Sequence, residues 1–188
     1  MSAWGKRAGR ELQNWAESVG FVYDPDDRGW AAFAGYALGT PGAPVAVASG
    51  FSQGFQVVLA QVSGQGRGSR GAHIRTAATA PRPLPSFTAR PRPREERREG
   101  GPAALRTGIA EIDAAYLLEA PDPLAASALL QPPATDRILE LDGAPLAAQG
   151  HWLATWRPGR FSPAEEGQLV AALAWLGQEF SRALATAP

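Results

Sequence analysis

Apolar residues near the N-terminus recur with the period of an α-helix. They are spaced three or four residues apart, so they share one face, at Trp4, Ala8, Leu12, Trp15 and Val19. Gly20 follows at the position where many helices end in a left-handed residue, and Phe21 is placed to fold back onto the last turn. The pattern predicts an N-terminal helix whose apolar face is buried.

The C-terminal part of the chain shows the same period together with a clear start signal. Ser162 is placed as an N-cap, Pro163 as the first helical residue and Glu165 as the partner in a capping box. One apolar face then follows at Leu169, Leu173, Leu176, Phe180 and Leu184. We therefore expect a long helix at this end as well.

Between these helices, short apolar runs alternate with turn-forming residues. We expect strands at residues 21–23, 30–38, 45–49, 55–62, 73–78, 87–90 and 114–120, and one or two strands in 146–156 split near Gly150. Residues 81–85 should form a stiff extended stretch, and short helices should cover 123–130 and 135–141. Because the first strands are joined by short turns, they should pair antiparallel. The predicted fold class is α+β, with a mainly antiparallel sheet of about five to seven strands packed against the N- and C-terminal helices.

The net charge of the 188-residue chain is zero, but its charges are unevenly distributed. Residues 67–106 contain ten arginines and three acidic residues, a net charge of +7, and the remainder carries −7. This distribution is typical of an acidic folded domain that carries a basic insert. Residues 63–71 are rich in glycine, and residues 91–102 have no apolar side chain able to anchor them. We expect a single domain over 1–188, with a flexible loop at 63–71 and a disordered, basic, proline-rich insert at 91–106.

The arginines of this basic region are the candidate binding residues. They are Arg90, Arg92, Arg94, Arg97 and Arg98. Arginines in this setting can neutralise phosphates of nucleic acid or of anionic lipid. Three nearby glutamates dilute the charge, however, and Phe87 is the one aromatic side chain available to stack on a base. The sequence favours a solvated linker, with weak binding of an anionic polymer or lipid as an alternative.

Catalytic and metal-binding residues are sparse. The chain has no cysteine, which excludes disulfides and thiolate chemistry, and its two histidines, His73 and His151, are isolated. His151 with Asp142 is a conceivable pair for a small hydrolase-like enzyme, but no Gly-x-Ser-x-Gly elbow accompanies it. The acidic turn that begins at Asp24 lacks the glutamate that a calcium-binding EF-hand loop requires. We expect no metal, no cofactor and no catalytic residues.

Three segments together resemble a known group of proteins. They are Trp15-Ala-Glu-Ser-Val-Gly-Phe21, Leu84-Pro-Ser-Phe-Thr-Ala-Arg-Pro91, and the segment from Ala114 to Leu130 with its Ala-Pro-Asp-Pro-Leu turn into a helix. In this order they resemble a bacterial, actinobacterial-type α+β family of unknown function. Some members of that family carry transmembrane segments. The resemblance implies a fold, but it assigns no catalytic residues.

The function that the sequence favours is a non-enzymatic protein-interaction or accessory domain. The expected partner is another protein, and nucleic acid or an anionic membrane surface is less favoured. No apolar run reaches the roughly 18–20 residues needed to span a bilayer, and the N-terminus lacks the apolar core of a signal peptide. The expected location is therefore the cytoplasm.

Overall fold

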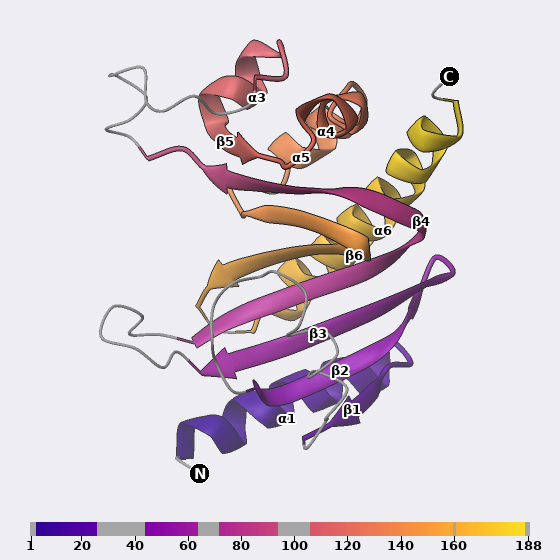
Figure 1. The fold of residues 1–188 in the computed structure, drawn as a ribbon. Coiled ribbons are helices and arrows are strands. Elements are labelled where there is room, and N and C mark those ends of the chain that lie inside the picture. Colours follow the sequence, from indigo (N-terminus) through magenta and orange to yellow (C-terminus); the bar gives the residue numbers. More distant parts are fainter. Residues whose placement is uncertain (1–2, 26–43, 64–71, 94–105, 160, 187–188) are drawn as a thin grey trace.

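The computed structural model describes residues 3–25, 44–63, 72–93, 106–159 and 161–186. Within these residues, strands form one antiparallel sheet, and helices lie before, between and after them (Figure 1). The strands are β1 (Val22–Asp24), β2 (Pro44–Ser52), β3 (Phe55–Ser63), β4 (Ala72–Pro91), β5 (Tyr116–Glu119) and β6 (Leu146–Pro158). The helices are α1 (Ala3–Ser18), α3 (Ala110–Ala115), α4 (Pro123–Leu129), α5 (Ala134–Leu139) and α6 (Pro163–Thr186). The α+β prediction is confirmed, with six strands in the sheet.

The sheet is organised around two bent strands that lie one inside the other. β1, β2, β3 and β4 pair in sequence order, β5 pairs with the end of β4, and β6 pairs with both arms of β4. The first arm of β6, before Gly150, pairs with the second arm of β4, for example Leu146↔Ala89. The second arm of β6, after Gly150, pairs with the first arm of β4, for example Leu153↔Ala78. Figure 1 shows β4 turning back at one side of the sheet with β6 inside the turn.

The bend in β4 has a cause in its sequence. The pairing register between β4 and β6 shifts between Thr79 and Leu84, where Pro81 and Pro83 have no N–H group to donate to a neighbouring strand. β6 bends opposite this point at Gly150, whose φ of 56° is one that glycine adopts without strain. The sequence predicted two strands at 73–78 and 87–90 with a stiff stretch between them. The structure joins all three into a single strand of 20 residues.

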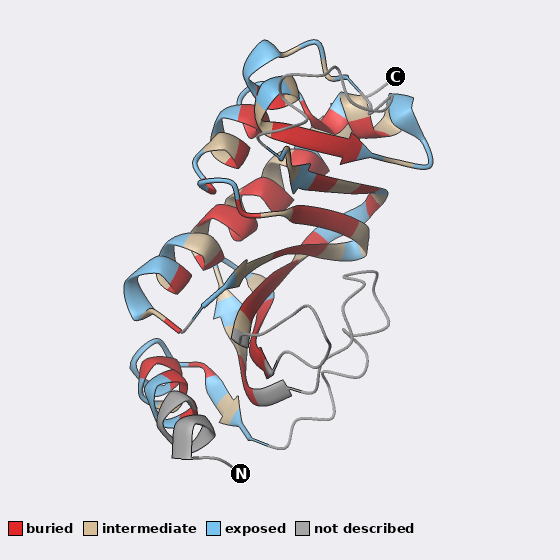
Figure 2. Cartoon of the chain, turned by 90° about the vertical axis from the view of Figure 1, so that its left-hand side faces the viewer, coloured by how far each residue is buried: buried red, intermediate tan, exposed pale blue. Residues whose placement is uncertain are grey.

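Both long helices cover the same face of the sheet. Figure 2, turned by 90°, shows α1 and α6 on one side of the strands, with buried residues along their inner faces. The main core lies between these helices and the sheet. It includes Leu12, Leu59, Leu153, Leu173 and Phe180, which are all 0% exposed. The opposite face carries a smaller apolar cluster built from β2, β3, β4 and β6, with Trp152 and Trp156 packed against it.

The end of α1 forms the predicted left-handed cap. Gly20 has a φ of 76°, and the Phe21 N–H donates to the Ala16 carbonyl at 2.7 Å, so the Phe21 ring reaches the core. The prediction that Val19 belongs to the buried face is wrong, because its side chain is 46% exposed. α1 ends at Ser18, and the turn that follows carries Val19 away from the sheet.

Other predicted elements differ in their boundaries. The strand predicted at 114–120 begins at Tyr116, because α3 occupies the preceding residues. Asp113 stabilises this helical turn by accepting hydrogen bonds from the backbone N–H groups of Thr107 and Gly108, at 2.9 and 3.2 Å. The predicted short helices correspond to α4 and α5. The strand predicted at 30–38 and most of the loop predicted at 63–71 lie outside the described residues.

Gly50 in β2 is required by the close approach of Phe21. A Cβ atom at Gly50 would lie 2.3 to 2.8 Å from atoms of the Phe21 ring. In contrast, a Cβ at Gly167 in α6 would meet nothing within 4 Å. Gly50→Ala should therefore lower the free energy of unfolding by about 1–3 kcal/mol through overpacking, whereas Gly167→Ala should raise it by about 0.5–1 kcal/mol through helix propensity. Urea denaturation measures both changes. A Gly50→Ala variant as stable as the parent would mean that the Phe21 ring is not confined.

Candidate binding groove

A groove opens where α5, the turn after it, the end of β6 and the first half of α6 meet. Its volume is about 730 Å³, within the range of about 300–1,000 Å³ found for pockets that bind small ligands or side chains. The apolar part of its lining is Leu141, Ala144, Pro145, Trp156, Pro158, Leu169, Ala171 and Ala172, and the polar part is Arg137, Glu140, Asp142, Gly143, Arg157, Glu165 and Gln168. We call this feature the α5–α6 groove.

The turn at one rim of the groove follows from its sequence. Asp142 and Gly143 have φ values of 51° and 74°, a left-handed pair for which Asp-Gly is a favoured sequence. The Ala144 N–H donates to the Leu141 carbonyl at 3.0 Å, which closes the turn. The Thr155 hydroxyl donates to the Pro145 carbonyl at 2.7 Å and ties the turn to the second arm of β6. These bonds hold Asp142 at the rim, exposed to solvent.

A buried carboxylate lies behind the opposite wall. Glu166, in the first turn of α6, has a side chain that is 0% exposed. Its Oε1 accepts from the Arg157 Nε at 2.8 Å and also from Nη2, and its Oε2 accepts from the Thr76 hydroxyl at 3.0 Å. One carboxylate therefore joins α6 to β6 and β4.

The environment of Glu166 changes the acidity of its carboxyl group. Burial raises the pKa of Glu166 above the usual range for glutamate, and the charge of Glu165 also raises it. The positive charge of Arg157, and the hydrogen bonds from Arg157 and Thr76, act in the opposite direction without fully offsetting the burial. Glu166 therefore depends on Arg157 to remain ionised inside the fold.

Each arginine of the groove is paired with an exposed glutamate. Arg157 Nη2 also lies 2.8 Å from Glu165 Oε2, and Arg137 pairs with Glu140 one turn along α5. The guanidinium of Arg137 lies over the Trp175 ring, 5.9 Å from its centroid. Asp142 makes no ion pair or side-chain hydrogen bond within the part of the chain that the structure describes. The charged groups of the groove are thus two paired arginines and an excess of carboxylates.

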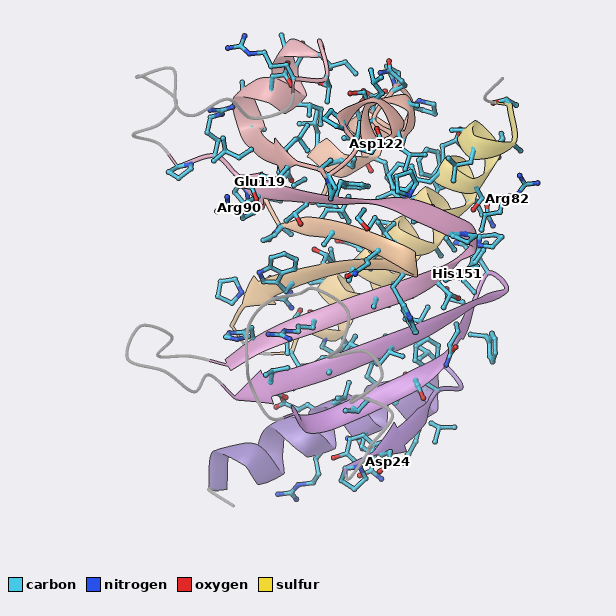
Figure 3. All side chains as sticks on the ribbon, viewed as in Figure 1. Asp24, Arg82, Arg90, Glu119, Asp122 and His151 are labelled. Carbon is cyan, nitrogen blue, oxygen red and sulfur yellow. The ribbon has the colours of Figure 1, made fainter. Side chains whose placement is uncertain are left out.

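The candidate arginines of the basic region are not brought to this groove. Arg90, at the end of β4, forms an ion pair with Glu119 of the neighbouring β5, and Figure 3 shows the two side by side. Arg92 donates through Nε to the Asp113 carbonyl at 3.2 Å, and its own N–H donates to the Ala115 carbonyl at 2.8 Å. Arg94, Arg97 and Arg98 lie outside the described residues. A binding role for these five arginines stays a prediction.

The proposed pairing of His151 with Asp142 does not occur. Asp142 lies in the turn before β6, and His151 lies just beyond the first arm of β6, residues 146–149. The four extended residues of that arm, a span of roughly 13 Å, therefore come between them. His151 Nδ1 lies 3.1 Å from the Ala80 carbonyl at the bent side of the sheet, opposite the side that carries Arg90 (Figure 3).

Across the described ranges no three acidic or histidine side chains are grouped to hold a metal ion. His73, whose pKa is lowered by burial and by Arg75, lies in the first arm of β4.

Glu166 was not among the predicted site residues, although the sequence carries a signal for it. The predicted start of the helix rests on Glu165, and the predicted apolar face begins at Leu169. The residues of α6 that are buried at helical spacing are Glu166, Val170, Leu173, Gly177 and Phe180. An acidic residue in phase with such a face indicates a buried carboxylate, which requires a partner. Its partner Arg157 could not be identified, because the two meet through tertiary packing.

The fold of the chain is shared with a solved protein structure. No family model and no curated protein matches the sequence. The crystal structure of the mycobacterial trehalose monomycolate transport factor A, TtfA, aligns with a TM-score of 0.61 over 96% of each chain, at 13% sequence identity. Identity this low shows a common fold only. The resemblance to an actinobacterial-type family therefore stays a prediction.

The dependence of Glu166 on Arg157 has a measurable consequence. Arg157→Ala should cost about 3–5 kcal/mol near pH 8, because it leaves a buried carboxylate without its counter-charge. Below the pKa of an unfolded glutamate, about 4.3, the carboxyl group is neutral in both states and the loss should be small. Because the pKa of Glu166 is raised in the folded protein, the stability of the variant should fall further below that of the parent as the pH rises through this raised pKa.

Arg182→Ala is the matched control, since Arg182 is 66% exposed and pairs with Glu179 on the surface of the same helix. It should cost less than about 1 kcal/mol at every pH. Denaturant unfolding from pH 4 to pH 8 measures both variants. A pH-independent loss in Arg157→Ala would show that packing of the arginine, and not its charge, is what Glu166 requires.

Proposed function

We propose that this chain is a non-enzymatic accessory domain that binds another protein through the α5–α6 groove. The observation that carries the proposal is the groove itself, which combines an apolar lining with exposed carboxylates and an unpaired Asp142 at its rim. Interaction sites commonly have this composition, with an apolar centre and a polar rim.

The geometry of the titratable groups supports a binding role over catalysis. The carboxylate whose pKa is raised, Glu166, is 0% exposed and is held by Arg157 and Thr76, so no substrate can reach it. Asp142 lies in the turn before β6, whereas His151 lies beyond the first arm of that strand. A general base must lie within hydrogen-bond reach of its substrate and of the group that orients it. Glu166 does not meet this requirement, and neither does the pair of His151 and Asp142.

The structural neighbour supports an accessory role. TtfA is described as a transport factor, and its fold matches this chain across nearly the full length of both proteins. We take this likeness as support for an accessory role of this chain. No helix within the described ranges is long and apolar enough to cross a bilayer. We propose a cytoplasmic location for the domain, as the sequence suggested.

Site-specific photo-crosslinking tests the proposal. Gln168 is exposed and lines the groove, and Arg182 is exposed farther along the same helix, about 20 Å away at 1.5 Å per residue. With p-benzoylphenylalanine at position 168, irradiation of cells that produce the protein naturally should give one discrete protein adduct. The same probe at position 182 should not give it. The cross-linked protein, once identified and purified, should give the same adduct with the purified chain.

Two results would count against the proposal. Equal adducts from positions 168 and 182 would mean that the groove is not the interaction site. Absence of any protein adduct from position 168, with the variant folded and expressed, would mean that the groove does not bind a protein.

A further inference from the structure

We infer that the α5–α6 groove selects a partner segment in which a lysine or arginine stands next to an apolar side chain. This inference rests on the proposed function and specifies the chemistry of the partner. It follows from how charge and apolar surface are arranged in the groove.

The carboxylates of the groove face solvent more than the arginines do. The side chains of Glu140 and Glu165 are 59% and 60% exposed, whereas those of Arg137 and Arg157 are 36% and 21% exposed. Asp142 is also exposed, on its left-handed turn at the rim. A partner that approaches the groove therefore meets three carboxylates first and two recessed guanidinium groups behind them.

These carboxylates have spare capacity to accept hydrogen bonds. Glu140 pairs with Arg137 through Oε2, and Glu165 pairs with Arg157 through Oε2. A carboxylate can accept about four hydrogen bonds. In the described structure, Oε1 of both glutamates and both oxygens of Asp142 are open. An incoming ammonium or guanidinium group can thus pair with them without breaking an existing ion pair.

The carboxylates of the groove would repel an anionic segment. It would have to displace Glu140 or Glu165 from its arginine while lying close to the remaining carboxylates. The N-terminal end of α6, which would otherwise attract an anion, already carries Glu165 and Glu166 in its first turn. Like charges brought together at an interface repel each other, so the arrangement disfavours acidic partners.

The lining of the groove accounts for the apolar part of the segment. Leu141, Ala144 and Pro145 contribute from the turn, and Leu169 contributes from the facing side of α6. Leu169 remains half-buried in the isolated chain. The exposed Gln168 beside it carries both donor and acceptor groups, which suit the backbone of an extended or helical segment. A partner segment can place a basic side chain beside the rim carboxylates and an apolar side chain against Leu169.

Selection from a displayed library of random peptides, with the full chain as bait, tests this inference. Enriched peptides should contain a lysine or arginine within a few residues of a leucine or aromatic residue. Asp142→Arg should weaken their binding by at least about tenfold, because it reverses charge at an exposed position of the rim. Glu119→Arg is the matched control, since Glu119 is an exposed carboxylate of β5 that does not line the groove, and it should leave binding unchanged.

The outcomes separate this inference from the proposed function. Enrichment of acidic or neutral peptides, or binding that is equal in Asp142→Arg and the parent, would overturn the partner chemistry. A protein adduct at Gln168 would still support the groove as an interaction site in that case. Failure to enrich any peptide would also overturn the inference, because open carboxylates beside an apolar surface should select short basic segments.

Discussion

The arrangement of the sheet and its last helix depends on the contact between Arg157 and Glu166. A fully buried carboxylate is costly unless a charge and hydrogen bonds compensate for the lost water. Here Arg157 from β6 and Thr76 from β4 provide that compensation and meet Glu166 at the start of α6. Arg157 lies only nine residues before Glu166 in the sequence, but Thr76 lies 90 residues before it. One carboxylate therefore joins the start of α6 to both central strands.

The α5–α6 groove is a consequence of this contact. Arg157 and Glu165, which line the groove, are placed by the same ion-pair network that holds Glu166. The facing wall is positioned by the Asp142-Gly143 turn and by the hydrogen bond from Thr155 to Pro145. A surface built on a buried network and a tight turn is rigid, which reduces the entropy lost when a partner binds. This rigidity suits a domain whose proposed role is recognition.

Features encoded locally could be predicted from the sequence, and features that arise from tertiary packing could not. The apolar periodicity of α1 and α6 and the left-handed cap at Gly20 follow from neighbouring residues. The bend that joins residues 72–91 into one strand was not predicted, because it requires β6 to pair with both arms of β4. The groove was missed for the same reason, since its walls meet only after β6 and α6 have packed. The clustered arginines of residues 67–106, in contrast, are evident from the sequence alone.

We propose that this domain recognises a protein partner through the α5–α6 groove. Hydrogen–deuterium exchange of the full chain, measured with and without the partner identified by crosslinking, tests it most directly. The account predicts slower exchange on binding at residues 137–145 and 163–172, with the edge strand β1 and the hairpin between β2 and β3 unchanged. Protection confined to the β1–β2 edge or to the basic region after β4, with the groove unchanged, would contradict it.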